Sequence, residues 1–333
     1  MQHRILGINK LIGLLATWQG FSVFMIGIFN WPTWVIWLNL VLFLLFILAA
    51  DVYKSVLLLL LLLPFYVVLP NAYFDTLSIW RPLFVMLFAV WFYRLDGIKA
   101  SSPKLEKGRA AFVTKFLNRA KKIEFLKWDK FLAWFSAACL ISLMWTELRI
   151  LGIKQILFFL NIYLFYLVVG NTVNSREKIV EVIKFTIYSL TVIISLGFVQ
   201  LFSTLVLGLD AFWVYWASFI SRLYYGLDFA RVALYSNSWF SFNGGRELRM
   251  FSILPDSQSF AYLCVFGVGF GLVYSLRLSG RLRSLLWSGV RFASLAVILS
   301  GTRAVWVGFL FPACAALYAY FKNFWLVFSK KFL

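Results

Sequence analysis

Long runs of apolar residues, broken by few charges, set the strongest limit on how this chain can fold. Hydrophobic residues make up 62% of its 333 residues and charged residues 14%, whereas soluble domains carry roughly a quarter charged residues. Many runs approach or exceed the ~18–20 residues that a helix needs to cross a bilayer. Seven consecutive leucines at residues 57–63 exclude the alternation of a transmembrane β-barrel. The sequence therefore predicts an all-α polytopic membrane protein.

We expect about ten transmembrane helices. The predicted spans are residues 11–29, 34–50, 55–69, 77–93, 131–145, 150–169, 182–207, 259–276, 285–301 and 304–321. They divide the chain into amino-terminal membrane helices, a cytosolic basic linker, further membrane helices, an extracytoplasmic loop and carboxyl-terminal membrane helices. These parts are residues 1–95, 96–130, 131–207, 208–258 and 259–333, in that order.

The net charge of +19 does not indicate a nucleic-acid partner, because the basic residues gather in alternate loops between the spans. This positive-inside pattern places both termini on the cytosolic side of the membrane. In the linker, residues 110–128 mix apolar and basic side chains and predict a helix lying on the anionic inner leaflet. The alternative for this linker helix is a docking site for a partner.

The extracytoplasmic loop, residues 208–258, is rich in aromatic side chains. Such a segment is typical of short helices that lie in the membrane interface or re-enter the membrane. The triplet Asn243-Gly244-Gly245 predicts a turn within it. Farther along the chain, Gly267, Gly269 and Gly271 recur inside a predicted span and indicate a surface for close helix packing.

Three arginines lie where an apolar chain should least favour them. Arg246 and Arg249 are in the loop, three residues apart, so on a helix they would share a face. Arg303 lies between two apolar runs, at the outer edge of the last predicted span. Arginine near lipid faces headgroups, another charge or a polar cavity. Together the three predict an extracytoplasmic site for a phosphate-bearing lipid; taken singly, each arginine also fits a boundary residue or a headgroup contact.

Two motifs resemble the bacterial O-antigen ligase and O-antigen polymerase family of membrane glycosyltransferases. Residues 249–261 (RMFSILPDSQSFA) resemble its arginine-to-proline segment, roughly Arg-x-x-Gly-x-Phe followed by Pro-Asn. Residues 299–304 (LSGTRA) resemble its Leu-Thr-Gly-Ser-Arg-Gly segment at a span boundary. The two motifs occur in the family's order with one helical hairpin between them. The resemblance covers about the last third of the chain.

The resemblance implies transfer or polymerisation of a glycan from an undecaprenyl-diphosphate carrier, for cell-envelope polysaccharide, at the inner (cytoplasmic) membrane. Arg246, Arg249 and Arg303 would bind the diphosphate and stabilise its growing charge. Such transfer needs no metal and no cofactor. The acceptor hydroxyl needs a base or a hydrogen-bond acceptor, for which Asp256 is the candidate and Glu247 the other nearby carboxylate. Asp256 equally fits a simple cap of the following helix.

The chain departs from the family pattern in ways that limit this expectation. Asp256 stands where the family commonly has asparagine, and Ser252 and Ile253 stand where a glycine is usual. The family continues into a further helix and a histidine-bearing external loop, whereas the only histidine here is His3. The sequence thus predicts a truncated member, inactive alone, with a membrane partner supplying the carboxyl-terminal part. A non-catalytic membrane subunit and a polysaccharide or lipid transporter are the alternatives.

Overall fold

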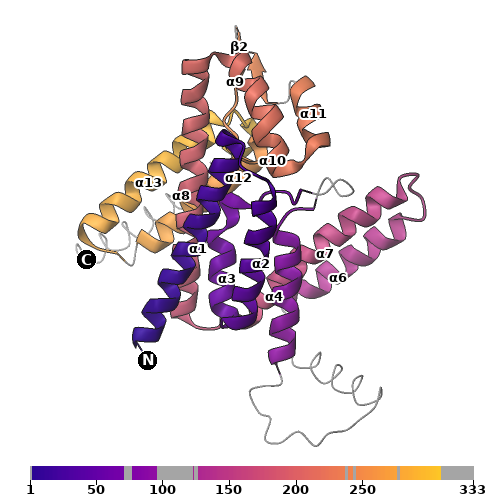
Figure 1. Ribbon diagram of the computed structural model, residues 1–333, viewed down its shortest axis with the longest axis vertical. Helices are drawn as coiled ribbons and strands as arrows, with labels where there is room; N and C mark the ends of the chain where they lie inside the picture. The colour runs from indigo at the N-terminus through magenta and orange to yellow at the C-terminus, as the bar shows by residue number, and fades with distance from the viewer. Residues whose placement is uncertain are drawn as a thin grey trace, which may run out of the picture. The chain divides into compact units, whose positions relative to one another are not determined.

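The computed structural model describes residues 2–70, 77–95, 123, 127–236, 239–242, 245–275 and 278–308. These residues are mostly helical (Figure 1), in agreement with the predicted all-α class. The chain divides into two compact units, Met1–Val182 and Ile183–Leu333. Most of the linker and most of the span predicted at residues 304–321 lie outside the described residues.

The amino-terminal unit is a group of helices. Its elements are α1 (Gln2–Phe29), α2 (Trp34–Ala49), α3 (Val52–Leu61), the 3-10 turn η1 (Leu63–Phe65), α4 (Trp80–Arg94), α6 (Lys127–Ser142) and α7 (Arg149–Thr172). The long helix α8 (Arg176–Leu207) begins in this unit and continues into the next. Within the unit, α4 packs against α2, α3 and α7.

A chain of polar side chains joins α1, α2 and η1. The Trp18 indole N–H donates to Asn39 Oδ1 at 2.8 Å, and Asn39 Nδ2 donates to Gln19 Oε1 at 2.7 Å. Gln19 Nε2 in turn donates to the carbonyl of Phe65 at 2.9 Å. Because lipid offers no hydrogen bonds, buried polar groups in a membrane helix need such internal partners. The contacts therefore fix the end of η1 against α1.

The single span predicted at residues 55–69 is wrong. Helix α3 has 10 residues and ends at Leu61. At 1.5 Å per residue it extends about 15 Å, half of a hydrocarbon core. Pro64 lies in the following 3-10 turn, and proline cannot continue an α-helix because it lacks an N–H and its ring clashes with the preceding turn. Val68 then pairs with Ser78 in an isolated β-bridge.

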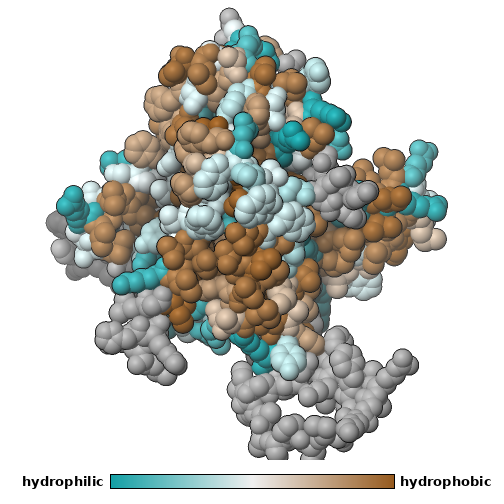
Figure 2. All heavy atoms as spheres, viewed as in Figure 1, coloured by the Kyte–Doolittle hydropathy of each residue, from teal (hydrophilic) through white to brown (hydrophobic). Residues whose placement is uncertain are grey.

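Five helices of the described residues are long and apolar enough to cross a membrane. They are Ile8–Phe29 within α1, α7, α8, α12 (Ser257–Ser275) and α13 (Gly280–Leu299). Large apolar side chains are exposed along many helices, and Figure 2 shows broad hydrophobic areas on the visible face. These features support a helical membrane protein, because lipid-facing side chains are apolar. The predicted count of ten spans stays a prediction.

The carboxyl-terminal unit contains the rest of α8 and the elements after it. These are α9 (Leu209–Tyr215), the π-helical turn η2 (Trp216–Ser221), α10 (Arg222–Tyr225), α11 (Leu227–Tyr235), β1 (Phe240–Phe242), β2 (Arg246–Leu248), α12 and α13. A β-carbon on Gly271 of α12 would lie 2.6 Å from Val290 Cγ2 of α13, and one on Gly267 would lie 3.4 Å from Leu190 of α8. The predicted glycine packing surface is confirmed at these two positions.

The segment between α8 and α12 is ordered around an aromatic cluster. The Trp213 ring lies 5.5 Å from the Trp239 ring and 4.9 Å from the Phe240 ring, centroid to centroid. The Tyr225 hydroxyl donates to the carbonyl of Ile253 at 2.6 Å, and burial raises the pKa of Tyr225, which keeps this donor protonated. The loop contains short helices, as predicted, and a β-hairpin accompanies them. Their place in the membrane interface or within the membrane stays a prediction.

Candidate functional site

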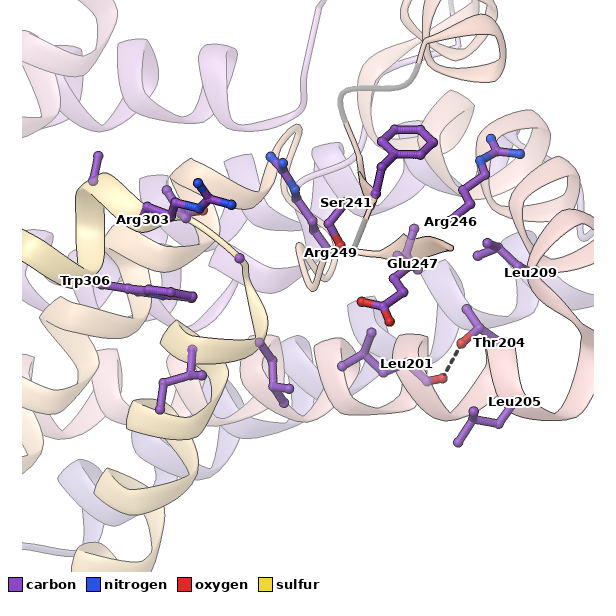
Figure 3. Close-up of a pocket in the computed structure, with 17 residues that line it drawn as sticks. Leu201, Thr204, Leu205, Leu209, Ser241, Arg246, Glu247, Arg249, Arg303 and Trp306 are labelled. Carbon is purple, nitrogen blue, oxygen red and sulfur yellow. Dashed lines mark hydrogen bonds between the residues drawn. The ribbon is translucent and has the colours of Figure 1, made fainter. Parts of the chain in front are cut away.

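A cavity of about 1260 Å³ lies in the carboxyl-terminal unit, at the β-hairpin and the ends of α8 and α13. We call it the arginine cavity. Its polar lining includes Arg246, Glu247, Arg249 and Arg303, and its apolar lining includes Leu201, Leu205, Leu209, Ile298, Leu299 and Trp306. Figure 3 shows these side chains around it. All three arginines singled out in the sequence thus line one cavity.

Arg246 and Arg249 do not share a helix face, because the segment that carries them is not helical. Arg246 is in strand β2 and pairs with Phe242 of β1. The ladder extends to Arg249, whose N–H donates to the carbonyl of Trp239 at 2.9 Å. Arg246 therefore lies in the strand and Arg249 just after its end. Long-range pairing with residues 239–242, which a local helical pattern cannot reveal, sets this geometry.

Arg246 is already occupied by partners from the protein. Its Nη1 lies 3.1 Å from Asp210 Oδ1 in an ion pair. Its guanidinium carbon lies 3.8 Å from the centroid of the Phe240 ring, a distance typical of a cation–π contact. The guanidinium is directed away from Arg249 in Figure 3. Arg246 therefore already has an anionic partner within the protein.

Arg249 is held against the end of α13. The N–H of the next residue, Met250, donates to the carbonyl of Leu299 at 3.0 Å. A β-carbon on Gly301 would lie 3.4 Å from Arg249 Cγ and 3.6 Å from Arg249 Nε. Gly301 has φ of +66°, a conformation that glycine adopts without strain. Arg249 Nε is buried and has no hydrogen-bond partner among the described residues.

Arg303 reaches the same cavity because the helical path breaks at Gly301. The Gly301 N–H donates to the carbonyl of Ile298, and a new helix begins at Arg303. In Figure 3 the Arg303 side chain extends toward the side of the view where the Arg249 guanidinium lies. Within the part of the chain that the structure describes, neither guanidinium forms an ion pair. Two cationic groups are therefore available at this end of the arginine cavity.

A buried glutamine of α8 fixes the main chain that follows Arg249. Gln200 Oε1 accepts from the N–H groups of Phe251 at 3.1 Å and Ser252 at 2.9 Å. Gln200 Nε2 donates to the carbonyl of Ser252 at 3.3 Å, and the Ser252 hydroxyl donates to the carbonyl of Ile193 at 2.6 Å. Gln200 was not among the residues predicted from the sequence. A polar side chain inside a predicted span was the available signal.

Asp256 caps α12 and does not line the arginine cavity. Its Oδ1 accepts from the Ser259 N–H at 2.7 Å, and its Oδ2 accepts from the Ser259 hydroxyl at 2.8 Å. The helix begins at the next residue, Ser257. The capping alternative is therefore confirmed. The carboxylate that the structure brings to the cavity is that of Glu247.

Comparisons with known protein families, with curated proteins and with solved structures give no match. The chemistry of the arginine cavity is therefore inferred from its own side chains. Among the described residues, no group of three His, Cys, Asp or Glu side chains is placed to hold a metal ion.

Substitution of Asp256 tests its role as a helix cap. Asp256→Ala is expected to lower the free energy of unfolding by about 1 kcal/mol, because the Ser259 N–H loses its acceptor. Asp256→Asn keeps an amide oxygen there and should cost less. Thermal unfolding of the purified protein measures both effects. Equal destabilisation by the two variants would contradict the capping role of the side-chain oxygen.

Proposed function

We propose that this chain transfers or polymerises a glycan from an undecaprenyl-diphosphate carrier during assembly of a cell-envelope polysaccharide. One observation carries the proposal. Arg249 and Arg303, from segments far apart in the sequence, line one cavity, and neither is neutralised by a described carboxylate. Charges left without partners in this way are suited to an anionic ligand.

The cavity lining suits both parts of a lipid diphosphate. Guanidinium groups bind phosphate oxygens through paired N–H donors, and they stabilise the negative charge that grows on a diphosphate leaving group. Leu205 and Ile298 are exposed, at 80% and 59% respectively, and line the same cavity. Such apolar side chains offer contact to a polyprenyl chain, which water solvates poorly.

The backbone at two motif positions also supports the resemblance to the O-antigen ligase and polymerase family. Ser252, at a position where that family usually has glycine, has φ of +56°. Gly301, in the second motif, has φ of +66°. Both values lie in the left-handed region that glycine favours. Ser252 therefore has a backbone conformation that glycine favours, at a position where that family usually has glycine.

The proposed function includes a topology. Ten spans would place both termini on the cytosolic side of the inner membrane and the arginine cavity on the opposite side. Arg303 and Lys322 are nineteen positions apart in the sequence, which would correspond to about 28 Å along a helix, close to one hydrocarbon thickness. Arg303 would then meet the outer headgroups, where a lipid-linked glycan presents its diphosphate.

Ligand titration and a deletion strain test the function together. The purified protein in nanodiscs is expected to bind undecaprenyl diphosphate more tightly than undecaprenyl monophosphate. The diphosphate offers a second phosphate group to the guanidiniums of Arg249 and Arg303. Excess phosphatidylglycerol serves as the control for general attraction to anionic lipid. Deletion of the gene is expected to remove a surface polysaccharide and to accumulate its lipid-linked precursor.

Two results would contradict the proposal. Equal affinity for the diphosphate, the monophosphate and phosphatidylglycerol would reduce the cavity to a general headgroup contact. Unchanged polysaccharide in the deletion strain would exclude glycan transfer, and would leave a non-catalytic subunit or a transporter as the interpretation.

A further inference from the structure

Glu247 is the one acidic side chain of residues 208–258 that forms neither a hydrogen bond nor an ion pair with a described residue. The other three are Asp210, paired with Arg246; Asp228, paired with Arg231; and Asp256, bonded to Ser259. Glu247 nevertheless lines a cavity that contains three arginines. Figure 3 shows its carboxylate turned toward α8, whereas the Arg249 guanidinium is turned away from it.

The hairpin holds Glu247 and Arg249 at nearby positions of one strand segment. Glu247 and Arg249 are two residues apart on one extended segment, or about 7 Å along the chain. The pairing of Ser241 with Glu247 fixes the strand at this point, and the bond between Arg249 and Trp239 fixes it two residues later. An anion at Arg249 and Arg303 and a hydroxyl group at Glu247 would therefore occupy neighbouring positions in the arginine cavity.

We propose that Glu247 accepts the proton of the acceptor hydroxyl in glycan transfer, an inference that rests on the proposed function. As the acceptor O–H gives its proton to a carboxylate oxygen of Glu247, the acceptor oxygen attacks the anomeric carbon of the donor sugar. A bond forms between these two atoms, and the bond from the anomeric carbon to the diphosphate oxygen breaks. The electron pair of that bond leaves with the diphosphate, and water later takes the proton from Glu247.

The charges in the cavity match the demands of this step. The leaving diphosphate gains negative charge, which Arg249 and Arg303 stabilise. The acceptor oxygen loses a proton, which requires a carboxylate or another base within hydrogen-bond reach. Asp256 does not meet this requirement, because it does not line the arginine cavity and its carboxylate caps α12. Glu247 thus replaces Asp256 as the candidate catalytic carboxylate.

The test uses the full chain in the deletion strain and in nanodiscs. Glu247→Gln keeps the size of the side chain but removes the proton acceptor. Surface polysaccharide formation is expected to fall by at least about 10²-fold, with the lipid-linked precursor accumulating. Affinity for undecaprenyl diphosphate should stay within about twofold of wild type. Asp228→Asn is the matched control, since it neutralises another exposed carboxylate of the same loop.

The outcomes separate this inference from the proposed function. Normal polysaccharide with Glu247→Gln would overturn the role of Glu247, and the proposed function would stand if Arg249→Ala still abolished the polysaccharide. Loss of diphosphate binding in Glu247→Gln would also overturn it, because the carboxylate would then support the donor site. Equal loss of polysaccharide in Asp228→Asn would show a general charge effect and overturn it as well. Failure of the wild-type chain to bind the diphosphate would remove the proposed function itself.

Discussion

Replacing both Arg249 and Arg303 with alanine is expected to lower the affinity for undecaprenyl diphosphate by at least about 10²-fold. A hydrogen bond to a charged group contributes about 1.5–3 kcal/mol, and each 1.4 kcal/mol is a factor of ten in affinity. Loss of both guanidiniums therefore removes about 3–6 kcal/mol. Titration of the nanodisc-embedded protein with undecaprenyl diphosphate measures the change.

The same cavity provides the matched control for this prediction. Arg246 lines it but is paired with Asp210 and lies over the Phe240 ring. Arg246→Ala should therefore change the affinity by only a few fold. If Arg246→Ala weakened binding as much as the double substitution, general positive charge rather than the two unpaired guanidiniums would hold the ligand.

Replacing Gln200 with methionine is expected to destabilise the protein by about 2–4 kcal/mol and to weaken diphosphate binding. Methionine has a similar length but provides no acceptor for the N–H groups of Phe251 and Ser252. Each buried group left without a partner costs about 1–3 kcal/mol. The segment that carries Arg249 would also lose its attachment to α8, so the guanidinium would no longer be fixed at the cavity.

Two measurements distinguish positioning from stability alone. Thermal unfolding gives the loss of stability, and titration well below the unfolding midpoint gives the affinity of the folded protein. Gln258→Met is the control, because Gln258 is exposed on α12 and its Nε2 makes a long 3.4 Å contact with Tyr262. An unchanged affinity in folded Gln200→Met would refute a positioning role for Gln200.

Features that depend on local sequence were largely predictable. The long apolar runs predicted α7, α8, α12 and α13, since a spanning helix satisfies its own backbone hydrogen bonds. The cap at Asp256 and the bend at Gly301 also follow from residue types at helix ends. Pro64 was an equally local signal that the third predicted span would break. The span was nevertheless predicted to be continuous, because of the run of leucines before Pro64.

Features that depend on distant partners were not predictable in this way. The loop segment that contains Arg246 and Arg249 is extended because residues 239–242 pair with residues 246–249. The ion pair with Asp210 removes Arg246 from the set of available cations, and nothing in the local sequence reports it. Gln200 likewise acquires its role only when Ser252 folds back onto α8. The sequence predicted which residues line the cavity better than it predicted their hydrogen-bond and ion-pair partners.

The bond from Met250 to Leu299 has a thermodynamic consequence for any anion that enters the cavity. Main-chain contacts bring Arg249 to the end of α13, close to Arg303 in the sequence. The conformational entropy that the chain loses in bringing these two arginines to one cavity is therefore lost during folding. An incoming ligand need not repeat that loss, and association is stronger when the receptor is preorganised.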